Sequence, residues 1–174
     1  KQQQDNQHSN NYYLHEDVNY YYTVCGLKLQ LPIAAEDAKN YILKVNNEPR
    51  VELMSYHLGK YYFVKDDFEN AITNYERAGI DNLSNDEIGD AKFEMAYSYF
   101  NLKRFNDAQP LFDEIRQLEE SKYYISANYY YGFISYYNRR YADALKSFKL
   151  VESQDEYKAV VPYYIAEIYY FQKK

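Results

Sequence analysis

The stretch LGKYYFVKDDFENAITNYERA, residues 58–78, decides the fold. Its leading small residue, Gly59, is followed twelve residues later by a second small residue, Ala71. Large aromatic residues accompany both, with Tyr62 after the first and Tyr75 after the second. Apolar residues that recur at intervals of three and four predict helices, and the polar run between the two halves predicts a turn. Residues 58–78 are therefore expected to form most of a hairpin of two antiparallel helices.

The same pairing of small residues recurs along the chain. A leading small residue is followed by a second one twelve positions later in four places, which are Gly26 with Ala38, Gly59 with Ala71, Ala96 with Ala108, and Gly132 with Ala144. A fifth leading small residue is Ala166. Successive leading residues are 33, 37, 36 and 34 positions apart, which is the length of a helix-turn-helix repeat. Because small residues let paired helices approach closely, the chain is expected to be a repeat array.

The residues of the turns agree with these hairpins. An aromatic residue lies three positions before the second small residue in three repeats, at Phe68, Phe105 and Tyr141, where it can fill the bend. The first repeat carries Ala35 there and is the weakest match. The expected helices cover residues 13–30, 34–46, 51–64, 67–79, 87–101, 106–119, 122–137, 141–152 and 158–172.

The composition supports an all-α fold. Five Gly and four Pro in 174 residues are too few for a many-turned β-sandwich or barrel, and a hydrophobic content of 47% can cover one continuous core. The 25 tyrosines taken alone favour strands. Their neighbours are Ala, Leu, Glu and Lys, however, and the apolar positions recur at helical intervals. An AT-rich coding sequence is the other explanation of the tyrosine excess.

The domain organisation follows from the point at which the helical pattern begins. Residues 1–11, KQQQDNQHSNN, lack apolar anchors and predict a flexible polar lead-in, or at most a frayed helix. Residues 12–174 keep the helical pattern without a linker, and they predict a single repeat array. Its expected repeats are residues 19–50, 52–84, 89–121 and 125–157, followed by a half repeat over residues 159–174.

The repeated residues resemble the tetratricopeptide repeat (TPR) pattern, in which a large residue, Leu-Gly and Tyr on one helix precede Ala and Phe on the next. Residues 58–78 are the best copy. The resemblance, which extends to bacterial TPR-containing proteins, implies an all-α, right-handed superhelical solenoid of about four and a half antiparallel hairpins. It also implies a protein-interaction scaffold. The family's opening Trp is absent, and its position holds Tyr22, Ser55, Lys92, Asn128 and Pro162.

The resemblance places the first helix of each hairpin on the concave side of the solenoid. Residues next to the packing stripe of these helices then point into a groove, and nearly all of them are aromatic. Such rings suit an extended or helical peptide, because they offer contact area with few rotatable bonds. The alternative is that part of these rings form core between adjacent first helices. The predicted partner-binding residues are Tyr56, Lys60, Phe63, Phe93, Tyr97, Phe100, Tyr129, Phe133, Tyr136, Tyr137, Tyr163 and Tyr170.

One known mode of partner binding is not expected. Family members that grip the acidic tails of heat-shock chaperones use Lys and Asn at paired groove sites. The corresponding pairs here are Thr23 with Leu27, Tyr56 with Lys60, and Phe93 with Tyr97. The sequence therefore lacks that clamp, and the identity of the partner stays open.

Several other function classes are disfavoured. A net charge of −6 with interspersed signs offers no basic stripe for nucleic acid, and no apolar run is long enough to span a membrane. Cys25 is the single cysteine, and His8, His15 and His57 are too scattered for a metal site. No phosphate-binding loop, nucleophile motif or catalytic carboxylate pair is found. We expect no cofactor, no metal and no enzyme activity.

The last expected helix, over residues 158–172, carries apolar residues but no partner helix follows it. Terminal repeats normally present a polar outer face. This pattern predicts either that the array continues or that the C-terminal helix takes part in self-association. Two functions stay open, a scaffold that binds a peptide or partner on an aromatic concave face, and a structural spacer with end-to-end contacts in a larger assembly. Resemblance to Tyr- and Asn-rich bacterial repeat proteins favours a periplasmic or cell-envelope location, with the cytoplasm as the alternative.

Overall fold

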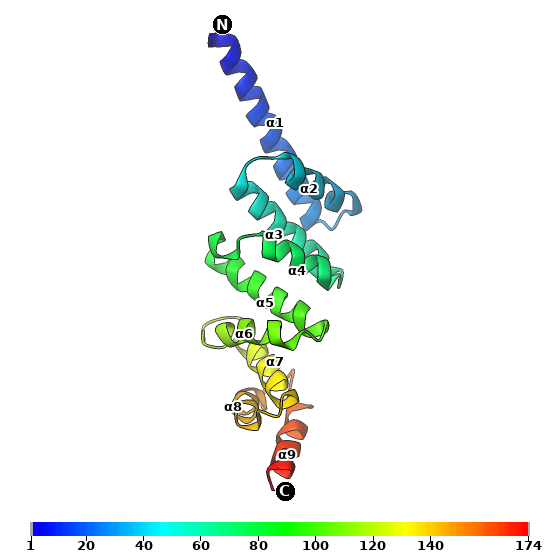
Figure 1. Ribbon diagram of the computed structural model, residues 1–174, viewed down its shortest axis with the longest axis vertical. Helices are drawn as coiled ribbons and strands as arrows, with labels where there is room; N and C mark the ends of the chain where they lie inside the picture. The colour runs from blue at the N-terminus through cyan, green and yellow to red at the C-terminus, as the bar shows by residue number, and fades with distance from the viewer. Residues whose placement is uncertain (1, 174) are drawn as a thin grey trace. The chain divides into compact units, whose positions relative to one another are not determined.

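The computed structural model describes the backbone of residues 2–173 and the side chains of residues 14–173. Over the described backbone the chain is helical without β-strands, which confirms the expected all-α class (Figure 1). The backbone is helical from Gln2, inside the segment for which the sequence predicts a flexible lead-in, and that flexibility stays a prediction. The helices are α1 (Gln2–Lys28), α2 (Pro32–Lys44), α3 (Glu48–Val64), α4 (Phe68–Arg77), the short 3-10 helix η1 (Ile80–Asn82), α5 (Asn85–Asn101), α6 (Phe105–Ile115), α7 (Tyr124–Tyr137), α8 (Tyr141–Val151) and α9 (Val161–Gln172).

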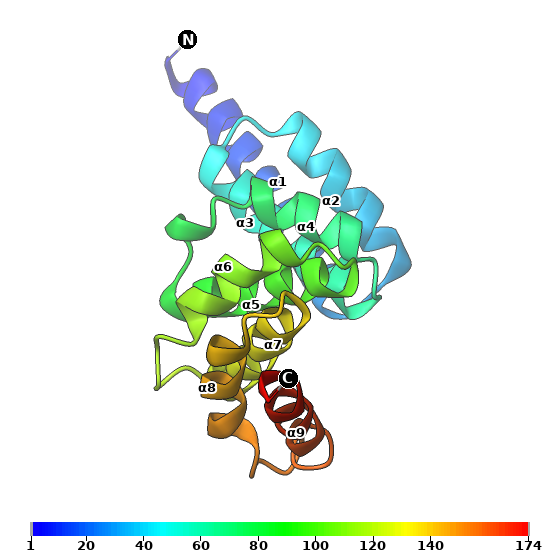
Figure 2. The same ribbon diagram turned by 60° about the horizontal axis from the view of Figure 1, so that its bottom comes forward.

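The chain divides into two compact units, which are Lys1–Leu83 and Ser84–Lys174. Unit 1 contains the hairpins α1/α2 and α3/α4. Unit 2 contains the hairpins α5/α6 and α7/α8, and then α9, which lies beside α7 and α8 (Figure 2). In each hairpin, two helices adjacent in sequence pack against each other, as the spacing of the small residues predicts. The exact repeat limits stay a prediction.

The leading small residues make room for an aromatic ring of the paired helix. A Cβ atom added to Gly59 would lie 2.9 Å from the ring of Tyr75, and one added to Gly132 would lie 3.0 Å from the ring of Phe148. Both rings are fully buried. In these two hairpins the close approach of the helices therefore joins glycine to a ring. In the first hairpin it joins two small residues, since a Cβ atom added to Gly26 would lie 2.9 Å from Cβ of Ala34.

The bends of the hairpins share one backbone geometry. A non-glycine residue adopts a left-handed conformation at each bend, with φ between 57° and 60°, at Gln30, Asp66, Lys103 and Arg139. The amide after it donates a hydrogen bond back to the last turn of the first helix, as from Arg104 N to Tyr99 O (2.8 Å). This arrangement is a Schellman motif, which satisfies carbonyl groups that the helix end leaves open. The second helix begins two residues later, at Phe68, Phe105 or Tyr141 in three of the hairpins.

The first hairpin is displaced by three residues from its expected alignment. In the other hairpins the left-handed residue comes seven positions after the leading small residue, but Gln30 comes only four after Gly26. On α1 the leading position is therefore held by Thr23, which is buried. Three residues are close to one helical turn, so both residues lie on one face and the sequence pattern does not separate them. Because α1 ends early, Leu29 lies beyond the helix and is exposed.

Candidate partner-binding surface

Apart from Tyr137, the predicted surface residues occupy three kinds of position on the first helices: three before, one after and four after the leading small residue. On α3 these positions hold Tyr56, Lys60 and Phe63. Tyr56 is buried, with its ring 6.3 Å from that of Tyr75, so it holds α3 on α4 and offers no open surface. Lys60 lies with its ammonium group 5.5 Å from the Tyr56 ring centre, and Phe63 packs against Phe68 at 6.3 Å.

On α5 the same positions hold Phe93, Tyr97 and Phe100, all of them partly buried. Tyr130 of α7 lies among these rings, at centroid distances of 6.3 Å from Phe93, 5.5 Å from Tyr97 and 4.8 Å from Phe100. It also stacks on Phe112 of α6 at 5.2 Å. The three predicted groove residues of α5 therefore bind α7 with one side of their rings, which makes them part of the core between repeats.

The arrangement recurs one repeat later in unit 2. Tyr164 of α9 contacts Phe133 at 5.8 Å and Tyr136 at 5.2 Å, and it stacks on Phe148 of α8 at 5.4 Å. Sequence analysis does not select Tyr130 or Tyr164. The feature that could have identified them is their position two residues before a leading small residue, directly after another tyrosine. The structure thus brings the predicted aromatic residues together, but mainly as packing between first helices.

A second set of tyrosines, also missed by sequence analysis, joins consecutive first helices. Tyr123 stacks on Phe93 at 4.2 Å and donates a hydrogen bond to Asp90 (2.9 Å). Tyr157 stacks on Tyr129 at 4.3 Å and donates to Ser126 (3.1 Å). Both tyrosines lie nine positions before a leading small residue. We call this position the clasp, because its side chain reaches back across the preceding first helix.

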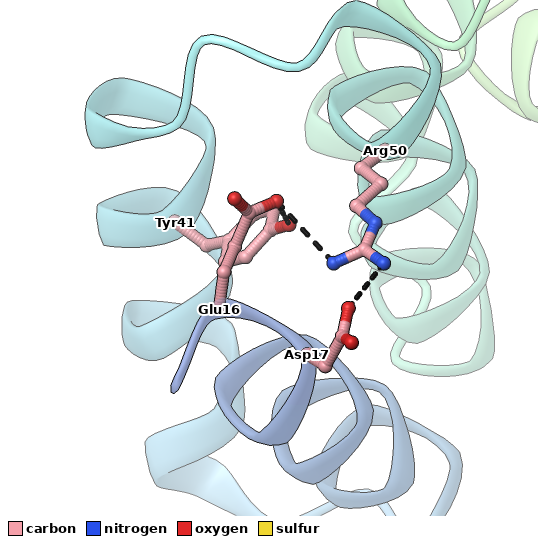
Figure 3. Close-up of polar contacts among 4 residues, drawn as sticks. All are labelled: Glu16, Asp17, Tyr41 and Arg50. Carbon is pink, nitrogen blue, oxygen red and sulfur yellow. Dashed lines mark hydrogen bonds and ion pairs between the residues drawn. The ribbon is translucent and has the colours of Figure 1, made fainter. Parts of the chain in front are cut away.

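In unit 1 the clasp position is held by Arg50, nine residues before Gly59. Its guanidinium carbon lies 5.4 Å from the ring centre of Tyr20, and its nitrogens form ion pairs with Asp17 and with Glu16 (3.3 Å) (Figure 3). With Thr23 as the leading residue of α1, Tyr20 and Asp17 occupy the same positions as Phe93 and Asp90. The clasp therefore contacts equivalent residues in both units, by charge in one and by stacking in the other.

Figure 3 shows that α1, α2 and α3 meet at this cluster. Tyr41 of α2 donates a hydrogen bond to the same Glu16 carboxylate at 3.3 Å. Burial raises the pKa of Tyr41 to about 12, and the hydrogen bond with Asp17 raises the pKa of Arg50. Burial and then the hydrogen bond to Asp90 raise the pKa of Tyr123 to about 12. These tyrosines stay protonated at neutral pH, so they donate hydrogen bonds and do not act as general bases.

One solvent-accessible part of the aromatic surface lies where α7 ends and α8 begins. A depression of about 400 Å³ is lined by Tyr136, Tyr137, Arg139, Tyr141 and Phe171. Tyr137 is 64% exposed, and the rings of Tyr141 and Phe171 lie nearly parallel at 6.0 Å. Two of the predicted site residues, Tyr136 and Tyr137, therefore line this depression together with Arg139, Tyr141 and Phe171.

The last two predicted site residues lie on α9. Tyr163 is 76% exposed and Tyr170 is 57% exposed, and both are far more open than their counterparts Tyr129 and Tyr136 on α7. They occupy the positions three before and four after Ala166, which is also exposed. The side of α9 that carries Tyr163, Ala166 and Tyr170 is therefore a second solvent-exposed surface.

Two kinds of site are not found within the described part of the chain. Among its residues, no group of three or more His, Cys, Asp or Glu side chains could hold a metal ion. In the same range, no helix combines the length and the apolar character needed to cross a membrane.

Comparison with known proteins identifies the fold. No protein-family model matches the chain, and no curated protein matches it significantly. The solved structure of MamA AMB-1, a TPR-like protein, superposes with a TM-score of 0.67 and 16% sequence identity, covering 92% of this chain and 84% of that chain. At this identity the likeness establishes the architecture alone. The chain has a TPR-like fold of repeated helix hairpins, which agrees with the resemblance in its sequence.

Proposed function

We propose that this chain is a protein-interaction scaffold that binds an extended peptide in the aromatic depression around Tyr137. A TPR-like fold is consistent with a scaffold and is generally non-enzymatic. The observation that carries the proposal is the depression of about 400 Å³ lined by four aromatic rings and one arginine. Exposed rings grouped around a hollow are unusual on a monomer surface and are typical of partner-binding sites.

The lining of the depression favours a particular peptide chemistry. The nearly parallel rings of Tyr141 and Phe171 form one wall, and an apolar or aromatic side chain can pack against such a wall. Arg139 is held in the left-handed bend between α7 and α8, with φ at 60°, so its backbone is fixed by the Schellman hydrogen bond. Its guanidinium group suits a carboxylate. The preferred ligand is a segment in which an apolar residue neighbours an acidic one.

Neighbouring aromatic residues support the depression without contacting the peptide directly. The ring of Phe105 lies 5.0 Å from that of Tyr137, and Phe133 and Tyr164 both contact neighbouring rings of the cluster. A partner would therefore meet a surface whose shape is set by a packed aromatic core. Such preorganisation lowers the entropy cost of binding.

The test is selection of random peptides on the full chain, followed by affinity measurement by fluorescence anisotropy. Selected peptides are expected to be enriched in apolar and acidic residues, and to bind Tyr137→Ala at least tenfold more weakly. Arg139→Glu should weaken the acidic peptides most. Tyr163→Ala is the matched control, since this ring is exposed but does not line the depression, and it should leave affinity unchanged. Selected peptides that bind Tyr137→Ala as tightly as the parent chain would contradict the proposal.

A further inference from the structure

Seven positions before the leading small residue, three of the first helices carry a side chain that contacts a neighbouring element. On α1 this residue is Glu16, which accepts a hydrogen bond from Tyr41 of α2 at 3.3 Å. On α3 it is Glu52, which accepts a hydrogen bond from Asn82 of η1 at 3.2 Å. On α7 it is Ile125, which packs against the core that α8 and α9 form. In these hairpins the position is therefore filled by a side chain that contacts the second helix or the segment after it.

The same position on α5 holds Gly89, which brings no side chain to it. Within the described part of the chain, a Cβ atom added to Gly89 would meet nothing within 4 Å. The free space belongs to a hollow of about 620 Å³ between the start of α5 and the end of α6. Glycine inside a helix is less favourable than alanine, so a helical glycine that no internal contact requires calls for an external reason. Close approach of the backbone of another molecule is such a reason.

One wall of the hollow is apolar. It consists of Ile88 of α5, Ile115 of α6 and Leu118, which follows α6. Ile115 is buried and Leu118 is 63% exposed, so the wall extends from the core to the solvent. Lys92 and Glu114 also line the hollow and form an ion pair with each other at 2.9 Å. The volume lies within the range of ligand sites, roughly 300–1,000 Å³, so the hollow can take a large aliphatic side chain.

A second depression, of about 610 Å³, adjoins the first and shares Gly89 with it. Asp86 and Glu120 contribute carboxylates to its lining, and both residues are exposed. Lys122 lines it as well, but its amine lies 2.6 Å from Asp90, so its charge is balanced by that carboxylate. Asp86 and Glu120 therefore give the second depression an excess of negative charge, which attracts a cation.

We propose that the two depressions bind an extended, basic segment of a partner protein, in which a large aliphatic residue lies two positions from Lys or Arg. Alternate side chains of an extended chain point to the same side, about 7 Å apart. The aliphatic side chain enters the apolar hollow, and the cation lies beside Asp86 and Glu120. The main chain between them crosses Gly89, where the missing side chain lets it approach. The depression around Tyr137 favours an acidic segment, so the two surfaces select different ligands.

The described residues of a second copy do not offer such a segment. Each of their Lys and Arg residues lies in a helix or in the turn next to one. A basic side chain in a helix does not have an aliphatic neighbour two positions away on the same side, because residues that share a helix face are three or four positions apart. The occupant is therefore another protein with an extended basic segment.

The probe is a heptapeptide with leucine at its third position, lysine at its fifth, and glycine and serine elsewhere. It is titrated into the isotope-labelled full chain, and the amide resonances of Gly89 and Ser121 are followed by NMR. Both resonances should shift as the peptide binds. A matched peptide with glutamate in place of lysine should bind at least tenfold more weakly. No shift at millimolar peptide would overturn the proposal, and so would shifts with dodecylamine alone, which would make a small amphiphilic amine the occupant.

Gly89→Leu is the decisive variant on the protein side. Nothing lies within 4 Å of the added Cβ, and leucine favours a helix more than glycine does, so the thermal midpoint should not fall. The new side chain occupies the apolar hollow, and affinity for the lysine peptide should drop at least tenfold. Unchanged affinity would contradict the proposal, since the peptide would then bind elsewhere. A concentration-dependent dimer of the parent chain that this variant abolishes would also contradict it, by making a second copy the occupant.

The charge of the second depression has a test of its own. Glu120→Lys should weaken binding of the lysine peptide at least fivefold and strengthen binding of the glutamate peptide. Glu119→Lys is the matched control, because Glu119 is the neighbouring carboxylate but does not line either depression, and affinity should change less than twofold. Equal losses for the two variants would count against the proposal, because overall charge would then explain the attraction. Tyr137→Ala should leave affinity for the lysine peptide unchanged, which separates this result from that of the depression around Tyr137.

Discussion

The residue at the clasp position joins two first helices in both units, but through different interactions. In unit 1 Arg50 reaches α1 through ion pairs with Asp17 and Glu16 and through the Tyr20 ring. In unit 2 Tyr123 and Tyr157 reach the preceding helix through stacked rings and a hydroxyl hydrogen bond. The contacted positions are equivalent. The contact is therefore made at the same positions in both units, while the chemistry of the contact differs.

The two chemistries should differ in strength. The Arg50 and Asp17 side chains are 28% and 45% exposed, and ion pairs this open to water contribute about 0–1 kcal/mol. Stacked rings add about 0.5–1.5 kcal/mol beyond the apolar area that they bury. Tyr157 is 9% exposed, so it adds most of the burial of a large side chain as well. We expect unit 2 to depend more on its clasps than unit 1 does.

Alkaline pH should produce the largest effect. The pKa of Tyr123 and that of Tyr136 are raised to about 12, in both cases mainly by burial. Above pH 10 the unfolded tyrosines lose their protons while the folded ones keep them, so stability present below pH 10 is lost as pH rises towards 12. Absorbance of tyrosinate at 295 nm and helix content by circular dichroism should change together in this window.

In unit 1 burial raises the pKa of Tyr41 to about 12 as well. Tyr123→Phe and Tyr41→Phe separate the units, because each removes one ionisable hydroxyl. The first should move the alkaline midpoint upward by protecting unit 2. Full tyrosine ionisation near pH 10 with all helices retained would contradict this account.

Loss of a buried clasp should be the next largest effect. Tyr157→Ala removes a buried ring and is expected to destabilise unit 2 by about 3 kcal/mol. Tyr157→Phe keeps the stack and loses only the hydrogen bond to Ser126, at a cost of about 1 kcal/mol. Hydrogen exchange of the α7 and α9 amides, followed by mass spectrometry, measures both. Equal losses for the two variants would show that the hydroxyl, not the stack, is the clasp.

The charged clasp should be weaker and sensitive to salt. Arg50→Ala is expected to lower the local stability of α1 and α3 by about 1 kcal/mol at low ionic strength. At 1 M salt, where screening acts over about 3 Å, the difference between variant and parent should shrink. Hydrogen exchange of α1 and α3 at both salt concentrations gives the comparison. A cost that does not change with salt would make the Tyr20 contact, rather than the ion pairs, responsible.

The smallest effect is expected at the bends, where the two units have the same left-handed backbone conformation. Asp66 in unit 1 and Lys103 in unit 2 both adopt left-handed backbone conformations that cost a residue with a side chain about 1 kcal/mol. Replacing either by Gly should stabilise its unit by about 0.5 kcal/mol, since the flexibility of Gly in the unfolded chain offsets part of the gain. Urea unfolding of both variants tests this. Opposite signs for the two would mean that the bends are not equivalent.

The hairpins could be predicted from sequence because their determinants are local. The interval from Gly59 to Ala71 and the aromatic residue Phe68 lie within one hairpin, and the structure places them as expected. The same reasoning misaligned the first repeat, because Thr23 and Gly26 share a helix face and only the bend at Gln30 distinguishes them.

The surface could be predicted only in part. The sequence places Phe93, Tyr97 and Phe100 on one side of a helix, and the structure brings all three against Tyr130 of α7. Whether such rings face solvent or the next helix depends on how repeats stack. The clasp residues escaped prediction for the same reason. Nothing in the local sequence around Tyr157 shows that its partner is Tyr129, because the two are brought together only when α9 packs on α7.

The stack of Tyr129 and Tyr157 has a further use, since the chain contains no tryptophan. Tyrosine emission is therefore not masked by a stronger fluorophore, and two rings 4.3 Å apart should exchange excitation energy efficiently. Separation of α9 from α7 would interrupt that exchange and change the anisotropy of the emitted light. Because 25 tyrosines emit together, and Tyr20 and Tyr21 for example lie 5.2 Å apart, the signal of α9 is the difference in anisotropy between the parent chain and Tyr157→Phe.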